Sequence, residues 1–265
     1  MLRGVSLIVG LLSIGISGFS QSAVLEKVWR TSASTSGLAE MDMRVNRLVA
    51  EVSRHHYKSD IKKLNALFSK THQRFLHSFV QYTGIEELNK GRFNCLTATT
   101  LFADILTKSG YKYTIIETNY HIFVVVNTTD GDVILETTDR FGGFINDKKK
   151  MNKALAVYRE NRLASATPLH HQYPFNIYQS VDTNELAGLL YFNQAVKAYN
   201  AHQWAQCSDQ LSASSGKTNS PRIAELAIML YHSVAQSNEL DDETRASILT
   251  RWRGVVLGGL PVASR

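Results

Sequence analysis

The chain has 265 residues, of which 44% are hydrophobic and 20% charged, and its formal net charge is +6. This composition is ordinary for a globular protein, and the length suffices for one large domain or two small ones. The densest basic patch, at 140–150, carries no nucleic-acid motif. We therefore interpret it as a solvated loop and expect no nucleic-acid partner.

Residues 1–20 are typical of a secretory signal peptide. Arg3 supplies the positive start, an apolar run follows to Phe19, and small residues precede the cleavage site expected after Ser20. The run is too short and too rich in glycine for a membrane-spanning helix. We expect an exported bacterial protein, periplasmic or secreted, with no stable membrane insertion after cleavage. An uncleaved N-terminal anchor is the alternative.

Three helices are predicted in the first part of the chain, at 23–33, 38–55 and 59–81. Their apolar stripes consist of Leu48, Val52 and His55 in the second helix, and Leu64, Leu67, Phe75 and Phe79 in the third. A fourth helix is expected from about 95 to 108, with Gly110 as its C-terminal stop.

Three strands are expected next, at 111–118, 121–127 and 133–138, with an Asp-Gly hairpin turn between the last two. A helix followed by an antiparallel sheet indicates an α+β fold. From 184 onward the pattern is helical, at 184–201, 203–214, 221–236 and 241–252, with Asp182 and Glu185 marking the first start. Residues 254–265 are predicted to fray.

The strongest functional signal is Cys95 at a helix start, followed by His121 and Glu136 on two predicted strands. A helix N-terminus favours a thiolate. A nearby His can act as acid and base, and a carboxylate can orient that His. Glu136 in an apolar strand supports the grouping, because a buried carboxylate requires a partner. For the oxyanion, the Cys95 backbone N–H is one candidate donor and the Gln81 side chain a weaker one.

The other cysteine and the His pairs carry weaker signals. Cys207 is expected to be a packed small apolar residue, and a Cys95–Cys207 bridge is the alternative. The His pairs at 55–56 and 170–171 lack the spacing of a metal site. We expect no metal and no organic cofactor.

At Asn94-Cys95, Tyr120-His121 and Leu135-Glu136 the sequence resembles the transglutaminase-like superfamily, a relative of the papain-like thiol enzymes. More narrowly it is similar to bacterial SirB1-type proteins, in which tetratricopeptide-like helices follow such a domain. After the signal peptide at 1–20, the resemblance implies a transglutaminase-like domain at 21–180 and a tetratricopeptide-like region at 181–255, followed by a tail at 256–265.

The resemblance also implies a triad, with Cys95 as nucleophile, His121 as base and acid, and Glu136 as the group that orients His121. The superfamily most often has Asp at the third position, so Asp139 is the alternative to Glu136. The expected function is amide hydrolysis or acyl transfer through a thioester, on a peptide or cell-envelope substrate. The alternative is a non-catalytic envelope scaffold that binds a protein partner through its C-terminal helices.

Overall fold

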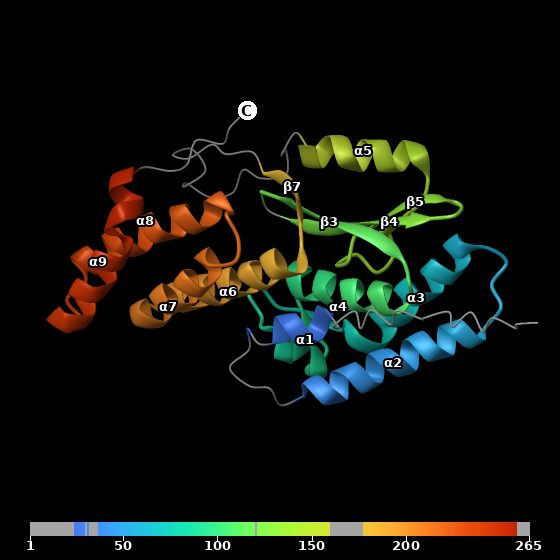
Figure 1. The fold of residues 1–265 in the computed structure, drawn as a ribbon, viewed down its shortest axis with the longest axis horizontal. Coiled ribbons are helices and arrows are strands. Elements are labelled where there is room, and N and C mark those ends of the chain that lie inside the picture. Colours follow the sequence, from blue (N-terminus) through green and yellow to red (C-terminus); the bar gives the residue numbers. More distant parts are fainter. Residues whose placement is uncertain (1–23, 30, 32–36, 120, 160–176, 259–265) are drawn as a thin grey trace, which may run out of the picture.

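The computed structural model describes residues 24–29, 31, 37–119, 121–159 and 177–258, so the expected signal peptide lies outside the described residues. Helices and an antiparallel five-stranded sheet make up this part of the chain (Figure 1). The α+β class predicted from the order of the elements is confirmed.

The helix α4 (Cys95–Lys108) lies at the centre of the fold, and all but three of its residues are buried. Strands β3 (Lys112–Thr118) and β4 (Ile122–Thr128) cover one side of it. The helices α1 (Val24–Trp29), α2 (Leu38–Arg54) and α3 (Asp60–Phe75) pack against it from below in Figure 1. Burial on most sides explains why apolar residues and small threonines are spread around this helix rather than confined to one stripe.

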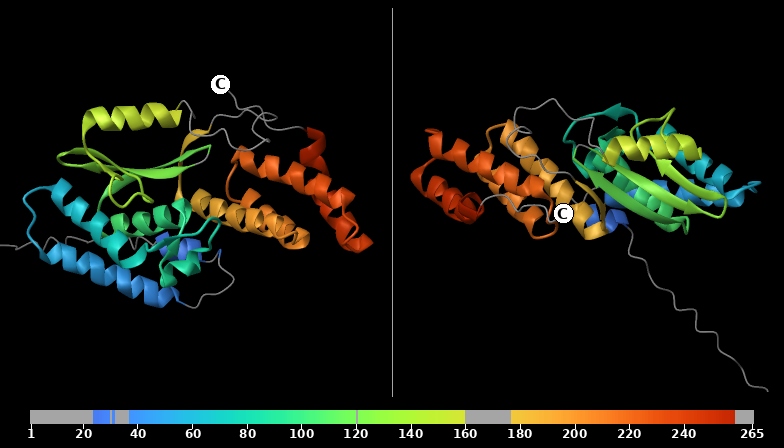
Figure 2. Two further views of the ribbon diagram at one scale, coloured as in Figure 1. Left: turned by 180° about the vertical axis from the view of Figure 1, so that it is seen from behind. Right: turned by 90° about the horizontal axis from the view of Figure 1, so that it is seen from above.

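The five-stranded sheet has the order β6-β5-β4-β3-β7, and each pair of neighbours is antiparallel. Its outer strands are β5 (Gly131–Leu135), β6 (Phe144–Ile145) and β7 (Tyr178–Val181). The helix α5 (Lys148–Arg159) crosses the face of the sheet opposite α4 (Figures 1 and 2). The core therefore lies between α4 and the sheet, and α5 only partly covers the outer face.

The predicted strands are close to the observed ones, but two boundaries differ where the chemistry is expected. His121 immediately precedes β4, and Glu136 immediately follows β5, whereas both were expected inside strands. The backbone turns at 137–138 and returns as β6, so the ladder of β5 with β4 ends at Leu135. Both side chains thus stand at strand ends, where neighbouring elements approach them.

The predicted helix at 59–81 was wrong in its last turn. Helix α3 ends at Phe75, and β1 (Ser78–Phe79) pairs in parallel with β2 (Arg92–Phe93). Phe79 is 58% exposed, so it does not continue the apolar stripe. His55 likewise falls outside its stripe, as the exposed C-cap of α2. Between β1 and β2 lies the short 3-10 helix η1 (Ile85–Lys90).

The charged residues at 140–150 are exposed, as predicted, but the segment is not a loop throughout, because it contains β6 and the start of α5. None of the α5 residues is fully buried. Its partly buried residues Met151, Leu155 and Tyr158 nevertheless recur at helical spacing, so the sequence does carry a helical pattern here, which the prediction missed. Strand β7, which has four residues, was not predicted either.

Four C-terminal helices follow, as predicted: α6 (Thr183–Asn200), α7 (Trp204–Ser215), α8 (Pro221–Gln236) and α9 (Asp242–Gly258). Asp182 caps α6 in a capping box with Glu185, as the sequence indicated. The prediction that the chain frays from 254 was wrong as far as Gly258, and residues 259–265 lie outside the described part.

Two apolar cores share the helix α6. Its first half, through Leu190, belongs to the core around α4, whereas Ala195 onward belongs to a second core within the C-terminal helices. Cys207 is fully buried in this second core, as expected for a packed small residue. The helical region is therefore joined to the first domain through a continuous helix rather than through a linker.

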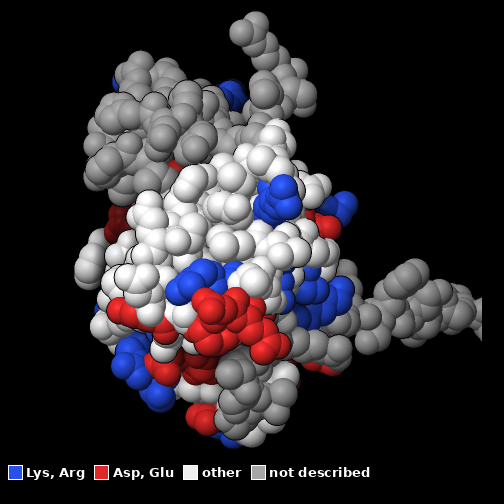
Figure 3. Space-filling view, turned by 90° about the vertical axis from the view of Figure 1, so that its left-hand side faces the viewer, with Lys and Arg blue, Asp and Glu red and all other residues white. Residues whose placement is uncertain are grey.

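The surface carries charges of both signs. On the face shown in Figure 3, acidic and basic side chains of the described residues lie next to one another. None of the helices in the described ranges is both long and apolar enough to span a membrane.

Candidate active site

Cys95 is the first residue of α4, and Asn94 fixes this helix start. The Asn94 side-chain oxygen accepts hydrogen bonds from the backbone N–H groups of Leu96 (3.0 Å) and Thr97 (2.9 Å). In return, the Asn94 N–H donates to the Thr97 hydroxyl at 2.9 Å, which completes a capping box. The cap holds the half-buried Cys95 at the positive end of the helix dipole, an environment that favours a thiolate.

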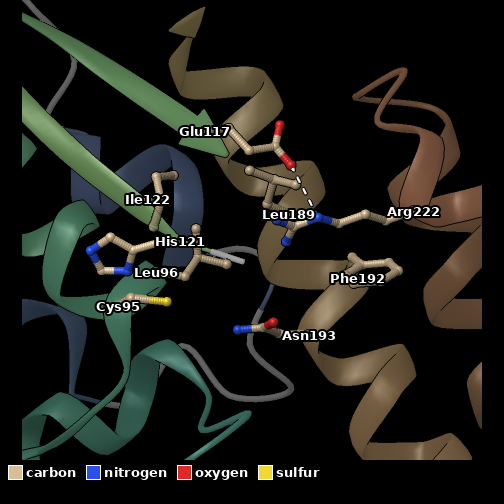
Figure 4. A pocket seen from close by; sticks show the side chains of 9 residues that line it. All are labelled: Cys95, Leu96, Glu117, His121, Ile122, Leu189, Phe192, Asn193 and Arg222. Atoms are coloured by element: carbon tan, nitrogen blue, oxygen red, sulfur yellow. Dashed lines mark ion pairs between the residues drawn. The ribbon is translucent and has the colours of Figure 1, made fainter. Parts of the chain in front are cut away.

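His121 lies between Cys95 and Glu136. Its Nε2 makes a short hydrogen bond with Glu136 Oε2, and its ring is within hydrogen-bonding reach of the Cys95 thiol. Figure 4 shows the imidazole and the thiol facing each other. The structure therefore brings together the three residues that the sequence singled out, from the start of α4, the start of β4 and the end of β5.

The charge of His121 follows from these contacts. Burial by itself lowers the pKa of an imidazole, but hydrogen bonds and charge from Cys95 and Glu136 outweigh it and raise the pKa to about 10. His121 is therefore an imidazolium at neutral pH. The Cys95 thiol thus faces a cation.

Tyr158 on α5 is a member of the site that sequence analysis missed. Its hydroxyl donates to Glu136 Oε1 at 2.6 Å, while its ring stacks on Phe123 with centroids 4.7 Å apart. Burial and the negative charge of Glu136 raise the pKa of Tyr158 above its ordinary value, so the hydroxyl remains a donor. Because each carboxylate oxygen has its own donor, Glu136 is held from two sides. No local motif marks Tyr158, since its partner lies 22 residues away in the sequence.

The carboxylate of Asp139, the alternative third residue of the triad, accepts hydrogen bonds within a turn. Its Oδ1 accepts from the N–H groups of Phe141 (3.0 Å) and Gly142 (2.9 Å). The same turn brings Gly143 against the Glu136 backbone, where the Glu136 N–H donates to the Gly143 carbonyl at 2.8 Å. A Cβ at Gly143 would lie 2.3 Å from two backbone oxygens, so only glycine fits. The turn thus positions Glu136 and leaves Asp139 pointing to solvent.

A small pocket, partly open to solvent, lies next to the thiol. The start of α4 and the ends of β3 and β4 form one part of its wall, and α6 and α8 form the rest (Figure 4). The lining residues are Cys95, Leu96, Glu117, His121, Ile122, Leu189, Phe192, Asn193 and Arg222.

The far side of the pocket contains a buried ion pair. The Glu117 carboxylate is 1% exposed, and it accepts hydrogen bonds from Gln179 (2.9 Å) and Ser220 (3.1 Å). Arg222 at the start of α8 approaches Glu117 with its Nε at 3.6 Å, and it also donates to the Thr118 carbonyl. These contacts fix α8 against β3 and so fix the position of the pocket wall.

The remaining candidates from the sequence lie elsewhere. Gln81 is exposed and does not line the pocket. Cys207 forms no disulfide with Cys95, and burial raises its pKa to about 12. Within the described ranges, no group of acidic, His and Cys side chains has the arrangement of a metal site. Tyr120 and the His pair at 170–171 lie outside the described residues.

The chain matches no protein-family model, no curated protein and no solved structure.

Proposed function

We propose that the chain is an exported thiol enzyme of the transglutaminase-like type, which hydrolyses or transfers an acyl group of a peptide or cell-envelope amide. The observation that carries the proposal is the position of His121, in contact with both the Cys95 thiol and the Glu136 carboxylate. The signal-like segment at 1–20 supports export. The helix pairs after 183 support the tetratricopeptide-like interpretation of the C-terminal region.

In the proposed reaction, the Cys95 thiolate attacks the carbonyl carbon of an amide, and the carbonyl electron pair moves onto the oxygen. When the C–N bond breaks, the His121 imidazolium gives its proton to the departing amine, which leaves a thioester on Cys95. His121 then takes a proton from water or from a second amine as it attacks the thioester. The C–S bond breaks, which releases the acid or the new amide and returns the Cys95 thiolate. Glu136 keeps the imidazole oriented and stabilises its cationic form. We favour hydrolysis, because water is abundant outside the cell.

The alternative function, a non-catalytic scaffold that binds through its C-terminal helices, requires no reactive thiol. A blocked Cys95 would favour it. The open pocket beside the thiol and the contact with His121 favour the enzyme instead.

The test is the rate of Cys95 alkylation by iodoacetamide as a function of pH, in a Cys207→Ser background that leaves one thiol. We expect alkylation near pH 6 to be at least about tenfold faster than in His121→Ala, because the imidazolium stabilises the thiolate. The difference should disappear above about pH 10, where His121 loses its proton. Equal rates for the two proteins near pH 6 would contradict the proposal.

A further inference from the structure

Thiolate attack on an amide places a negative charge on the former carbonyl oxygen, and thiol enzymes stabilise this oxyanion with two hydrogen-bond donors. The first donor is available at the start of α4. The Asn94 side chain accepts from Leu96 and Thr97, and the Cys95 N–H has no acceptor among the described residues. A second donor has to come from another wall of the pocket.

Asn193 on α6 is in the right place for the second donor. It lines the same pocket as Cys95, and Figure 4 shows its amide directed toward the sulfur from the side opposite His121. Leu189, one helical turn earlier, lines the pocket as well, so this face of α6 forms the wall. The Asn193 amide makes no hydrogen bond to any described residue, and its two N–H groups remain available.

Gln81 is the competing candidate, because β1 and β2 run in parallel. Phe79 of β1 pairs with Phe93 of β2, and the same register continued by two residues places Gln81 at the level of Cys95. Its side chain is exposed, however, and it does not line the pocket. The position of the two amides relative to the pocket therefore favours Asn193.

We propose that the side-chain amide of Asn193 donates a hydrogen bond to the oxyanion formed on Cys95, together with the Cys95 backbone N–H. The proposal rests on the proposed thiol-enzyme function and deepens it. It makes the C-terminal helical region a part of the catalytic apparatus, because α6 supplies a group that touches the reacting atoms. The ion pair of Glu117 with Arg222 then serves to hold this helical wall against the sheet.

The test compares two reactions of the same thiol in the Cys207→Ser background. Acylation by p-nitrophenyl acetate passes through an oxyanion, whereas alkylation by iodoacetamide forms none. We expect Asn193→Ala to slow the burst of nitrophenolate by about tenfold or more and to leave the alkylation rate within about twofold. Gln194→Ala, which removes the neighbouring amide of α6 outside the pocket, should change neither rate. Cys95→Ala gives the background for subtraction.

Three results would overturn the inference. In the first, Asn193→Ala lowers both rates equally, which means that it perturbs the Cys–His pair rather than the oxyanion. In the second, Asn193→Ala leaves acylation unchanged, or Gln81→Ala shows the selective loss in its place; the thiol-enzyme function then still stands. In the third, the unmodified site reacts with both reagents no faster than a free thiol, and the proposed function fails together with the inference.

Discussion

Replacing Tyr158 with Phe tests whether the hydroxyl of α5 holds Glu136 in place. The variant removes one donor at 2.6 Å from the carboxylate and keeps the ring that stacks on Phe123. A hydrogen bond to a charged group contributes about 1.5–3 kcal/mol. Because the Glu136 side chain is only 12% exposed, water replaces the lost donor poorly. We expect a loss of about 2 kcal/mol in the free energy of unfolding and a several-fold lower rate of Cys95 alkylation near pH 6.

Tyr113→Phe is the matched control. This hydroxyl hydrogen-bonds to the uncharged Thr107 hydroxyl at 2.8 Å, in the same domain but outside the pocket. A bond between neutral groups contributes about 1 kcal/mol, and Cys95 reactivity should not change. Urea unfolding and iodoacetamide kinetics measure the two effects. If Tyr158→Phe retains full stability, or alters alkylation no more than Tyr113→Phe does, then Tyr158 does not support Glu136.

Three further predictions concern the supports of the site and the core. Gly143→Ala should lower Cys95 acylation by about tenfold or more, because its Cβ would displace the Glu136 backbone; activity close to that of the unmodified chain would contradict this account of the turn. Asn94→Ala should destabilise the fold by about 2 kcal/mol and slow alkylation, since it removes the α4 cap; a change in unfolding free energy below about 0.5 kcal/mol would show that the cap is dispensable. Burial, followed by the charge of Arg140, lowers the pKa of His72 to about 4. The imidazole therefore stays neutral in the folded chain, whereas in the unfolded chain it takes up a proton below about pH 6.5. Stability should therefore fall by about 3 kcal/mol between pH 6.5 and 4, and His72→Phe should remove this component of the pH dependence in urea unfolding; identical pH profiles for the two proteins would refute it.

Local sequence determined the elements that carry strong local signals. Asn94 before an apolar run predicts the start of α4, and Gly110, with a φ of 78°, permits the turn after its end. The Asp130-Gly131 pair predicts the hairpin of β4 with β5. These features depend on neighbours in the sequence, so the order of helix, sheet and helices followed from the residues alone.

Tertiary structure decided the elements with few local signals. The break after Phe75 follows from the pairing of β1 with β2, which lie 12 or more residues apart in the sequence. Helix α5 has apolar residues at helical spacing, but nothing local shows what they pack against, and the contact of Tyr158 with Glu136 spans 22 residues of sequence. Contacts across such distances leave no pattern in a single sequence.

The same division holds for the site. The three residues of the candidate site were apparent from the sequence, because a Cys at a helix start, a His and a buried carboxylate are rare enough to be noticed together. Only the folded chain places His121 and Glu136 at strand ends and holds Glu136 through Tyr158 and the Gly143 turn. Only the folded chain brings Asn193 and Arg222, from helices far beyond Cys95 in the sequence, to the wall of its pocket. The residue types in the sequence thus indicated the proposed chemistry, whereas the surroundings of these residues depend on long-range packing.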